Sequence, residues 1–256
     1  MTDAPLKIWS DRSESLLRLR LARPKANIVD AAMIAALAHA FAEHRDPGRL
    51  RAAMIDAEGP HFSFGASVEE HLPNQCAGML KGLHALLVAM LEWPRPILVA
   101  VQGQCLGGGL ELALAGGLIF ASRDAQLGQP EMKLGVFAPA ASCLLPLRLG
   151  QPAAEDLLFS GRSVGADEAL RLGLVQHVSG NGHDAALEYF DQHFAAKSAS
   201  SLGFAVRAAR EALGPEVKRR LAAVETLYLE GLMASRDANE GLAAFLAKRQ
   251  PVWEHH

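Results

Sequence analysis

The chain has 256 residues, of which 50% are hydrophobic and 21% are charged, and its formal net charge at pH 7 is −3. A chain of this length can bury a substantial core in one domain. Because the net charge is small and the lysines and arginines are scattered, the sequence argues against nucleic acid as a main partner.

The chain contains three cysteines, which lie far apart and outside any CxxC spacing: Cys76, Cys105 and Cys143. This pattern predicts neither a disulfide framework nor a zinc site, and it fits a reducing cytoplasm. The N-terminal residues MTDAPLKIW lack the charged and then apolar order of a signal peptide. The apolar segment 105–121 contains five glycines and Glu111, which argues against a membrane span. We therefore expect a cytoplasmic protein with no metal, no separate cofactor and no membrane partner.

The first part of the chain alternates between strand and helix patterns. Residues 17–21 alternate leucine with arginine, which predicts a half-exposed strand. Apolar residues recur every four positions from Val29 to Phe41, which predicts a helix with Asp30 as its N-cap. A second strand is predicted over 52–57 and a second helix over 79–91.

The middle of the chain repeats this order. A run rich in β-branched residues from Ile97 predicts a strand that is buried on both faces. Residues 107–117 then predict a helix, residues 118–122 another buried strand, and the segments near Pro152 and Ala166 further helices. Strands that alternate with helices indicate an α/β fold.

The strand pattern disappears beyond about Phe190, and an apolar helical stripe runs from Leu221 to Leu232. We therefore expect a core over residues 1–190 and a helical C-terminal region over residues 191–256. With no linker between them, the helical region is expected to pack on the core or on a neighbouring chain.

Two glycine-containing segments could present backbone N–H groups to an anion. In the first, HFSFGASVEE, the N–H of Ala66 follows Gly65. In the second, GQCLGGGLELA, the glycines 107–109 directly precede a helix, whose positive end favours negative charge. Both segments also allow a purely structural interpretation, as a turn and as close packing of a helix on a strand.

Two glutamates are candidates for proton transfer. Glu111 lies in an otherwise apolar helix, where burial would raise its pKa toward the range that is useful in catalysis. Glu131 follows Pro130, which is expected to break any helix and to place the glutamate on a loop. The alternative for each is a solvated side chain, with Glu111 in a first helical turn and Glu131 beside Lys133.

Taken together, these segments resemble the crotonase, or enoyl-CoA hydratase/isomerase, family over essentially the whole chain. The resemblance rests on FSFGAS at 62–67, GGGLELA at 107–113, QPE at 129–131 and the closing segment 240–249. It implies a ββα spiral with a helical C-terminal region that builds trimers, often paired as dimers of trimers.

The resemblance also implies roles for individual residues. The N–H groups of Ala66 and Gly108 would form an oxyanion hole for a thioester carbonyl, and Glu111 and Glu131 would be the catalytic pair. Coenzyme A would enter as part of an acyl-CoA substrate. The implied contacts with this substrate are Lys25, Ala26, Ile28, Ser63, Ser67, Val68, Phe245 and Lys248, and the last two reach a neighbouring subunit's nucleotide in the family.

The chain departs from the usual family pattern at two places. Ser67 stands where the family has an acidic residue in the loop that carries Ala66. Residues 136–142, VFAPAAS, replace a glycine-rich stretch that, in the family, helps to wall the acyl pocket. With these changes, segments 61–73 and 128–146 resemble the family's cyclohexa-1,5-diene-1-carbonyl-CoA hydratases of anaerobic benzoyl-CoA degradation. That likeness implies a 1,4-addition of water that gives 6-hydroxycyclohex-1-ene-1-carbonyl-CoA. The candidates for lining a ring pocket are Phe64, Phe137 and Pro139, for which ordinary packing is the alternative.

Two other functions share these residues. A generic hydratase of short linear enoyl-CoA substrates would use the same catalytic residues and differ in the pocket. A crotonase-fold protein without activity could serve as an acyl-CoA-binding scaffold, although the retained pair Glu111 and Glu131 argues against it. The sequence does not assign the acid and the base within the pair, nor does it decide between a trimer and a dimer of trimers.

Overall fold

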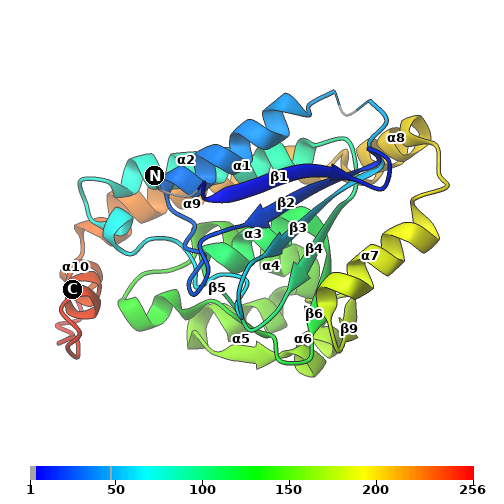
Figure 1. Ribbon diagram of the computed structural model, residues 1–256. Coiled ribbons are helices and arrows are strands. Elements are labelled where there is room, and N and C mark those ends of the chain that lie inside the picture. The colour runs from blue at the N-terminus through cyan, green and yellow to red at the C-terminus, as the bar shows by residue number, and fades with distance from the viewer. Residues whose placement is uncertain (1–3, 47) are drawn as a thin grey trace.

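A computed structural model describes residues 4–46 and 48–256, which fold around a six-stranded sheet (Figure 1). Its strand order is β1-β2-β3-β4-β6-β9, with β1 antiparallel to β2 and every other neighbouring pair parallel. A three-stranded sheet, β5-β7-β8, lies beside it. The strands are β1 (Leu6–Asp11), β2 (Leu16–Leu21), β3 (Ala52–Ala57), β4 (Ile97–Val101), β5 (Gln104–Leu106), β6 (Gly117–Ser122), β7 (Gln126–Gly128), β8 (Ser163–Gly165) and β9 (His177–Ser179).

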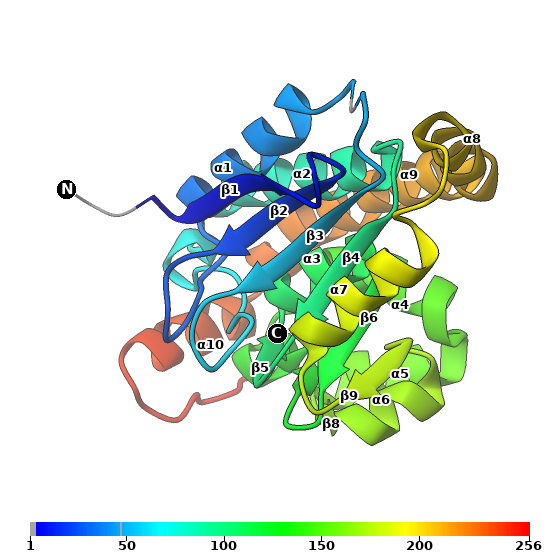
Figure 2. The same ribbon diagram turned by 45° about the vertical axis from the view of Figure 1, so that its right-hand side comes forward.

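Helices cover both faces of the large sheet (Figure 2). Alternate residues of β4 point to opposite faces, so that Ile97 and Val99 join the core beneath α1 and α2, whereas Leu98 packs toward α7. The α/β fold class is confirmed. The α-helices are α1 (Ala31–Glu43), α2 (Cys76–Glu92), α3 (Gly108–Gly116), α4 (Pro139–Leu149), α5 (Gln151–Ser160), α6 (Ala166–Leu172), α7 (Gly182–His193), α8 (Ala199–Arg210), α9 (Leu213–Thr226) and α10 (Arg236–Leu246).

The cap predicted for α1 is confirmed, because the Asp30 side chain accepts a hydrogen bond from the backbone N–H of Met33 at 2.9 Å. Short helical turns complete the chain. They are the 3₁₀ turns η1 (Glu69–His71), η2 (Pro130–Leu134) and η4 (Leu232–Ala234) and the π-helical turn η3 (Leu227–Gly231).

The prediction of a half-exposed strand at residues 17–21 is wrong. Strand β2 lies between β1 and β3, and even Arg18 is buried. Asp56 of β3 makes this possible, because its carboxylate accepts hydrogen bonds from Arg18 at 2.7 Å and from Arg20 at 2.6 Å. The arginines therefore face a buried partner rather than solvent.

Replacing Asp56 with Ala is expected to lower the free energy of unfolding by about 3 kcal/mol, because the buried Arg18 would lose its buried partner. Denaturant-induced unfolding measures this change. Glu58→Ala, which removes the exposed ion pair with Lys7, is the matched control and should cost less than about 1 kcal/mol. Equal stabilities of the two variants would contradict the role assigned to Asp56.

Beyond Ser179, the residues that the structure describes form helices and connecting segments but no strand. Helix α9 packs against α2 and α4, and α7 packs on the large sheet. The predicted boundary at residue 190 therefore falls inside a helix that covers the sheet, and the division into 1–190 and 191–256 stays a prediction. Among the described helices, none is both long and apolar enough to cross a membrane.

Candidate active site

The two predicted N–H donors lie next to each other. Ser63 and Cys105 form a parallel bridge, which places the loop after β3 beside the start of α3. A Cβ atom built on Gly108 would lie 3.0 Å from the backbone nitrogen of Ala66. Within residues 4–46 and 48–256, neither the Ala66 N–H nor the Gly108 N–H has a hydrogen-bond acceptor. Two unpaired donors that face the same place can bind an oxyanion.

The loop that carries Ala66 is held by Ser63. The Ser63 hydroxyl donates to the backbone carbonyl of Asn27 at 2.8 Å and accepts from the N–H of Gly65 at 3.0 Å. Gly65 has φ +107°, a conformation that favours glycine. Ser63 is fully buried and lines neither of the two cavities described below. It therefore lies under the loop that carries Ala66 and does not face a cavity that could hold a substrate.

Glu111 is buried in the first turn of α3, where it faces the N-terminus of α4. Its Oε1 atom accepts a hydrogen bond from the backbone N–H of Ala141 at 2.8 Å. Burial raises the pKa of Glu111, and the N–H groups of Ala141 and Ala140 and the nearby His84 oppose that shift. The ionised form of Glu111 is therefore stabilised by groups that stay fixed in the fold.

Glu131 lies in the 3₁₀ turn η2 and not on the predicted loop. Pro130 occupies the first turn of η2, where its missing N–H costs nothing, so the proline begins this short helix instead of preventing one. The Glu131 carboxylate lies against Gly107, at which a Cβ would come within 2.6 Å of Oε1. With its amide nitrogen turned toward Glu131, Gln129 donates to both carboxylate oxygens, at 3.0 and 3.1 Å.

The pKa of Glu131 is raised to about 8, first by burial and second by the charge of Glu111. Two carboxyl groups that repel each other in a buried place titrate as a pair, and one of them holds a proton near neutral pH. This arrangement supplies one proton donor and one proton acceptor beside the two free N–H groups.

An inner pocket of about 70 Å³ brings these four residues together. Ala66, Gly108, Glu111 and Glu131 all line it, as do the ring-pocket candidates Phe64, Phe137 and Pro139. Sequence motifs did not reveal the rest of its apolar wall, which is formed by α2, η2 and α10. That wall consists of Met79, Leu80, Leu83, Leu134 and Leu242.

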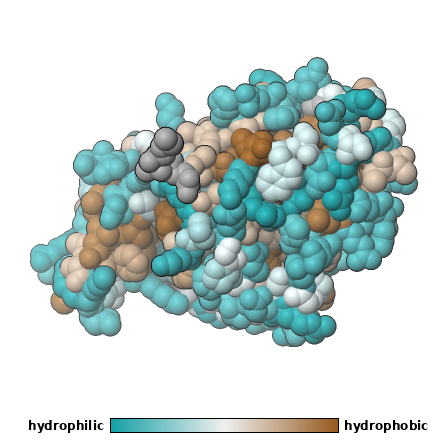
Figure 3. All heavy atoms as spheres, in the orientation of Figure 1, coloured by the Kyte–Doolittle hydropathy of each residue, from teal (hydrophilic) through white to brown (hydrophobic). Residues whose placement is uncertain are grey.

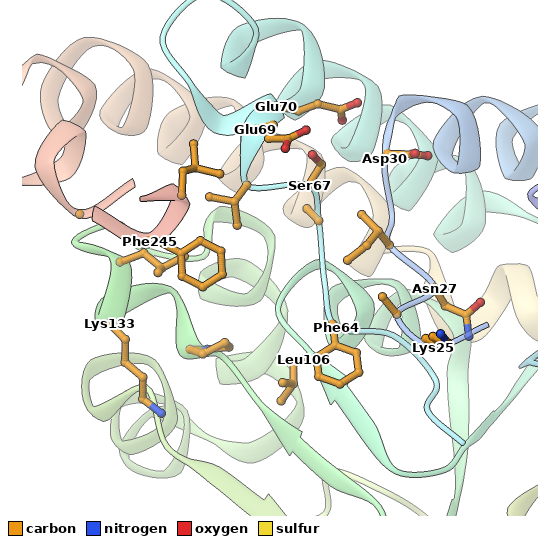
Figure 4. Close-up of a pocket in the computed structure, with 18 of the residues that line it drawn as sticks. Lys25, Asn27, Asp30, Phe64, Ser67, Glu69, Glu70, Leu106, Lys133 and Phe245 are labelled. Atoms are coloured by element: carbon orange, nitrogen blue, oxygen red, sulfur yellow. The ribbon is translucent and has the colours of Figure 1, made fainter. Parts of the chain in front are cut away.

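The inner pocket adjoins an outer cavity of about 1100 Å³, since both share Phe64, Ala66, Val68, Pro130 and Leu134 as lining residues. In Figure 4, Lys25 and Lys133 lie on opposite sides of this outer cavity, with Phe64 and Leu106 between them. A small pocket that opens into a large cavity lined by both basic and acidic groups suits a compact reactive group on a long carrier.

The outer cavity contains six of the eight residues that were implied to contact coenzyme A: Lys25, Ala26, Ile28, Ser67, Val68 and Phe245. The other two, Ser63 and Lys248, do not line it. Phe245 here lies on the wall of its own chain's cavity. Basic residues that the sequence analysis missed also line it, namely Arg23, Lys133 and Arg249, of which Arg23 is paired with Asp30 and Arg249 with Glu240.

The model of the family Enoyl-CoA hydratase/isomerase matches residues 11–256. The chain belongs to this family. Over 252 residues, which are 98% of each chain, it is 64% identical to a protein named cyclohexa-1,5-dienecarbonyl-CoA hydratase from Thauera aromatica. It is 33% identical over 253 residues to carnitinyl-CoA dehydratase of Salmonella paratyphi A, with 95% of this chain and 96% of that protein covered.

The fold expected for an enoyl-CoA hydratase/isomerase is confirmed by a solved structure. The crystal structure of an enoyl-CoA hydratase/isomerase from Pseudoalteromonas atlantica T6c superposes with a TM-score of 0.86 at 30% sequence identity, over 97% of this chain and 99% of that one. Across the described residues, no cluster of three or more histidine, cysteine, aspartate or glutamate side chains could hold a metal ion. The three cysteines are free and buried.

Proposed function

We propose that this enzyme of the hydratase/isomerase family adds water to cyclohexa-1,5-diene-1-carbonyl-CoA in a 1,4-addition, giving 6-hydroxycyclohex-1-ene-1-carbonyl-CoA. The observation that carries the proposal is the inner pocket, where two carboxyl groups and two unpaired N–H donors share one small apolar space. The 64% identity to the Thauera aromatica hydratase supports the cyclic substrate. Such a reaction belongs in anaerobic aromatic degradation.

The thioester carbonyl oxygen is bound by the N–H groups of Ala66 and Gly108, which stabilise the negative charge that this oxygen gains during the reaction. Water forms its carbon–oxygen bond at the ring carbon β to the carbonyl. A proton bonds to the far end of the second double bond, and the remaining double bond shifts between these two positions. One water molecule is consumed, with no change in oxidation state of the enzyme.

Glu111 acts as the base and Glu131 as the acid in this proposal. Backbone N–H groups of α4 favour the ionised form of Glu111, which takes a proton from the attacking water. Glu131, with its pKa raised to about 8, is protonated at neutral pH and donates its proton to the ring. The two carboxyl groups then exchange protons through solvent before the next turnover.

The outer cavity would hold the coenzyme A part of the substrate. Lys25 and Lys133 provide positive charge for its phosphates, and the exposed ring of Phe245 provides an apolar surface. Because the coenzyme A part would be bound away from the reacting carbons, its binding energy can hold the ring against the two carboxyl groups.

A parallel assay tests the proposed substrate. The cyclic dienoyl-CoA, crotonyl-CoA and a longer enoyl-CoA are compared by kcat/KM, and the cyclic substrate is expected to exceed the others by tenfold or more, because the inner pocket is small and walled by Phe64, Phe137 and Pro139. Comparable turnover of crotonyl-CoA would instead support a generic hydratase. Tight binding of all three thioesters without reaction would support a scaffold.

We also propose that the chain assembles as a trimer or a dimer of trimers in the cytoplasm. Apolar side chains gather on the surface over α10 and the segment that follows it (Figure 3). They include Phe245, Leu246, Val252 and Trp253, whose exposed fractions are 52%, 39%, 70% and 37%. A surface of this kind is suited to contact between subunits.

The proposed location in the cytoplasm is supported by the three free cysteines, which are compatible with a reducing compartment.

A further inference from the structure

A histidine lies in the otherwise apolar wall of the inner pocket. Of the described residues that line this pocket, only Glu111, Glu131 and His71 have nitrogen or oxygen atoms in their side chains. Every other lining residue is a glycine, alanine, proline, valine, leucine, methionine or phenylalanine. The proposed mechanism gives each glutamate a proton transfer, but it leaves His71 without a role.

The ring of His71 is fixed by a hydrogen bond to its own turn. His71 is the last residue of η1, the turn that follows the loop carrying Ala66. Its Nδ1 atom lies 2.7 Å from the backbone carbonyl oxygen of Ser67. Because a carbonyl oxygen only accepts hydrogen bonds, Nδ1 carries the proton in this contact. The same bond holds the ring in place relative to the neighbouring N–H donor of Ala66.

The second ring nitrogen of His71, Nε2, has no hydrogen-bond partner within the described part of the chain. The side chain is half-buried, and this burial lowers the pKa of His71 more than the Ser67 carbonyl raises it. In a neutral ring with its proton on Nδ1, Nε2 is a hydrogen-bond acceptor. His71 therefore brings one free acceptor to the wall of the inner pocket.

The proposed addition of water creates a donor that needs such an acceptor. The attacking water has two protons, and Glu111 takes one of them. The other proton stays on the oxygen and becomes the hydroxyl proton of the product. Glu131 acts at the far end of the diene, away from the new hydroxyl group. A hydroxyl group held against an apolar wall without a partner is unfavourable, so this proton requires an acceptor of its own.

We propose that His71 binds the attacking water and then the product hydroxyl through Nε2, which accepts a hydrogen bond from the proton that Glu111 does not take. The inference rests on the proposed function and deepens it, because it names the group that recognises the hydroxyl. His71 transfers no proton in this role, and the remaining O–H bond stays intact. Held by Glu111 and His71 together, the water oxygen is aimed at the ring carbon β to the carbonyl.

Binding of two thioesters tests this contact. They are 6-hydroxycyclohex-1-ene-1-carbonyl-CoA and cyclohex-1-ene-1-carbonyl-CoA, which differ only in the hydroxyl group. Their dissociation constants are measured by calorimetric titration of the wild type and of His71→Asn. The asparagine amide can still donate to Ser67, but it places no acceptor at the position of Nε2. We expect the preference for the hydroxylated thioester to fall about tenfold in this variant, the effect of losing one hydrogen bond.

Two further variants make the test specific. His71→Gln places an amide oxygen near the position of Nε2 and should restore part of the preference. Leu83→Val alters the apolar wall of the same pocket and should change both affinities alike, which leaves the preference as in the wild type. An unchanged preference in His71→Asn would overturn the proposal. An equal loss of affinity for both thioesters would overturn it too, because His71 would then only support the loop that carries Ala66.

Steady-state kinetics give a second readout. The cyclic dienoyl-CoA has no hydroxyl group, so its KM should change little in His71→Asn. Its kcat should fall about tenfold, because the contact forms only with the water and the nascent hydroxyl. A raised KM at unchanged kcat would contradict the role of His71.

A third readout uses the wild-type protein, which keeps the proposal testable if the variants fold poorly. In protein with isotope-labelled histidine, the magnetic resonance signal of the His71 Nε2 atom should move when the hydroxylated thioester binds. It should move much less with the thioester that lacks the hydroxyl group, and equal changes would overturn the inference.

These measurements also separate the inference from the proposed function. If His71 is needed for the preference but the wild type does not hydrate the cyclic dienoyl-CoA, the proposed function fails while the hydroxyl contact stands. If the wild type hydrates this substrate and His71→Asn has the same preference and kcat, the proposed function stands and the role of His71 fails.

Discussion

Glu131→Gln is expected to lower kcat for the cyclic dienoyl-CoA by about 10²- to 10⁴-fold, because the amide has nearly the shape of the carboxyl group but no acidic proton. The same loss is expected for Glu111→Gln, since an amide cannot accept a proton from water. Binding of the product thioester should change little in either variant, because the oxyanion donors and the outer cavity are intact. Steady-state kinetics and product titration measure the two effects.

The wild-type pH profile provides the control for these variants. Glu131 must be protonated to act as the acid, so kcat/KM should fall as the pH rises through about 8. Glu111 must be ionised, so activity should also fall at low pH as its carboxylate gains a proton. Near-normal turnover by either glutamine variant would contradict the assignment of this pair.

Gly108→Ala is expected to lower kcat by about 10²- to 10³-fold, comparable to the loss of one oxyanion donor, because the added methyl group would keep an oxyanion away from the two N–H groups. The added Cβ would lie 3.0 Å from the Ala66 nitrogen and 3.1 Å from its Cβ, in the space that the proposed mechanism assigns to the thioester oxygen. The backbone of Gly108 has no positive φ, and alanine favours a helix more than glycine does. The variant should therefore fold and still lose activity.

The matched control for this variant is Gly78→Ala. Gly78 lies in α2, and a Cβ there would meet no atom within 4 Å. Its kcat should equal that of the wild type, and both variants should unfold at similar denaturant concentrations. If Gly108→Ala retained full kcat, the oxyanion site would have to lie elsewhere.

The strands and helices of the core could be predicted because their patterns are local. The error at residues 17–21 shows the limit of such patterns. A half-exposed strand would show the same alternation of leucine and arginine as this buried strand. The residue that makes the burial possible, Asp56, lies 38 positions after Arg18 on another strand. Burial of an arginine depends on such a distant partner, which no local period reveals.

The same distinction applies to the candidate site. Glu111 and Glu131 could be selected from their motifs, but their different electrostatic settings could not. Glu111 is stabilised by the first turn of α4, 30 positions further along the chain, and by His84 of α2. The sequence indicates only a solvated Lys133 beside Glu131, because the place of Lys133 on the outer cavity depends on how the turn η2 packs.

The walls of the two cavities come from different parts of the chain. The outer cavity is formed largely by residues 23–30, 64–70 and 241–251, whereas residues 136–139 contribute only to the inner pocket. After duplication of the gene, substitutions at 136–139 would therefore change the acyl specificity of one copy. The proposed recognition of coenzyme A in the outer cavity would be kept. Such a layout makes new catabolic enzymes accessible through few mutational steps, and it marks these four positions as the first to randomise when the substrate range is to be altered by directed evolution.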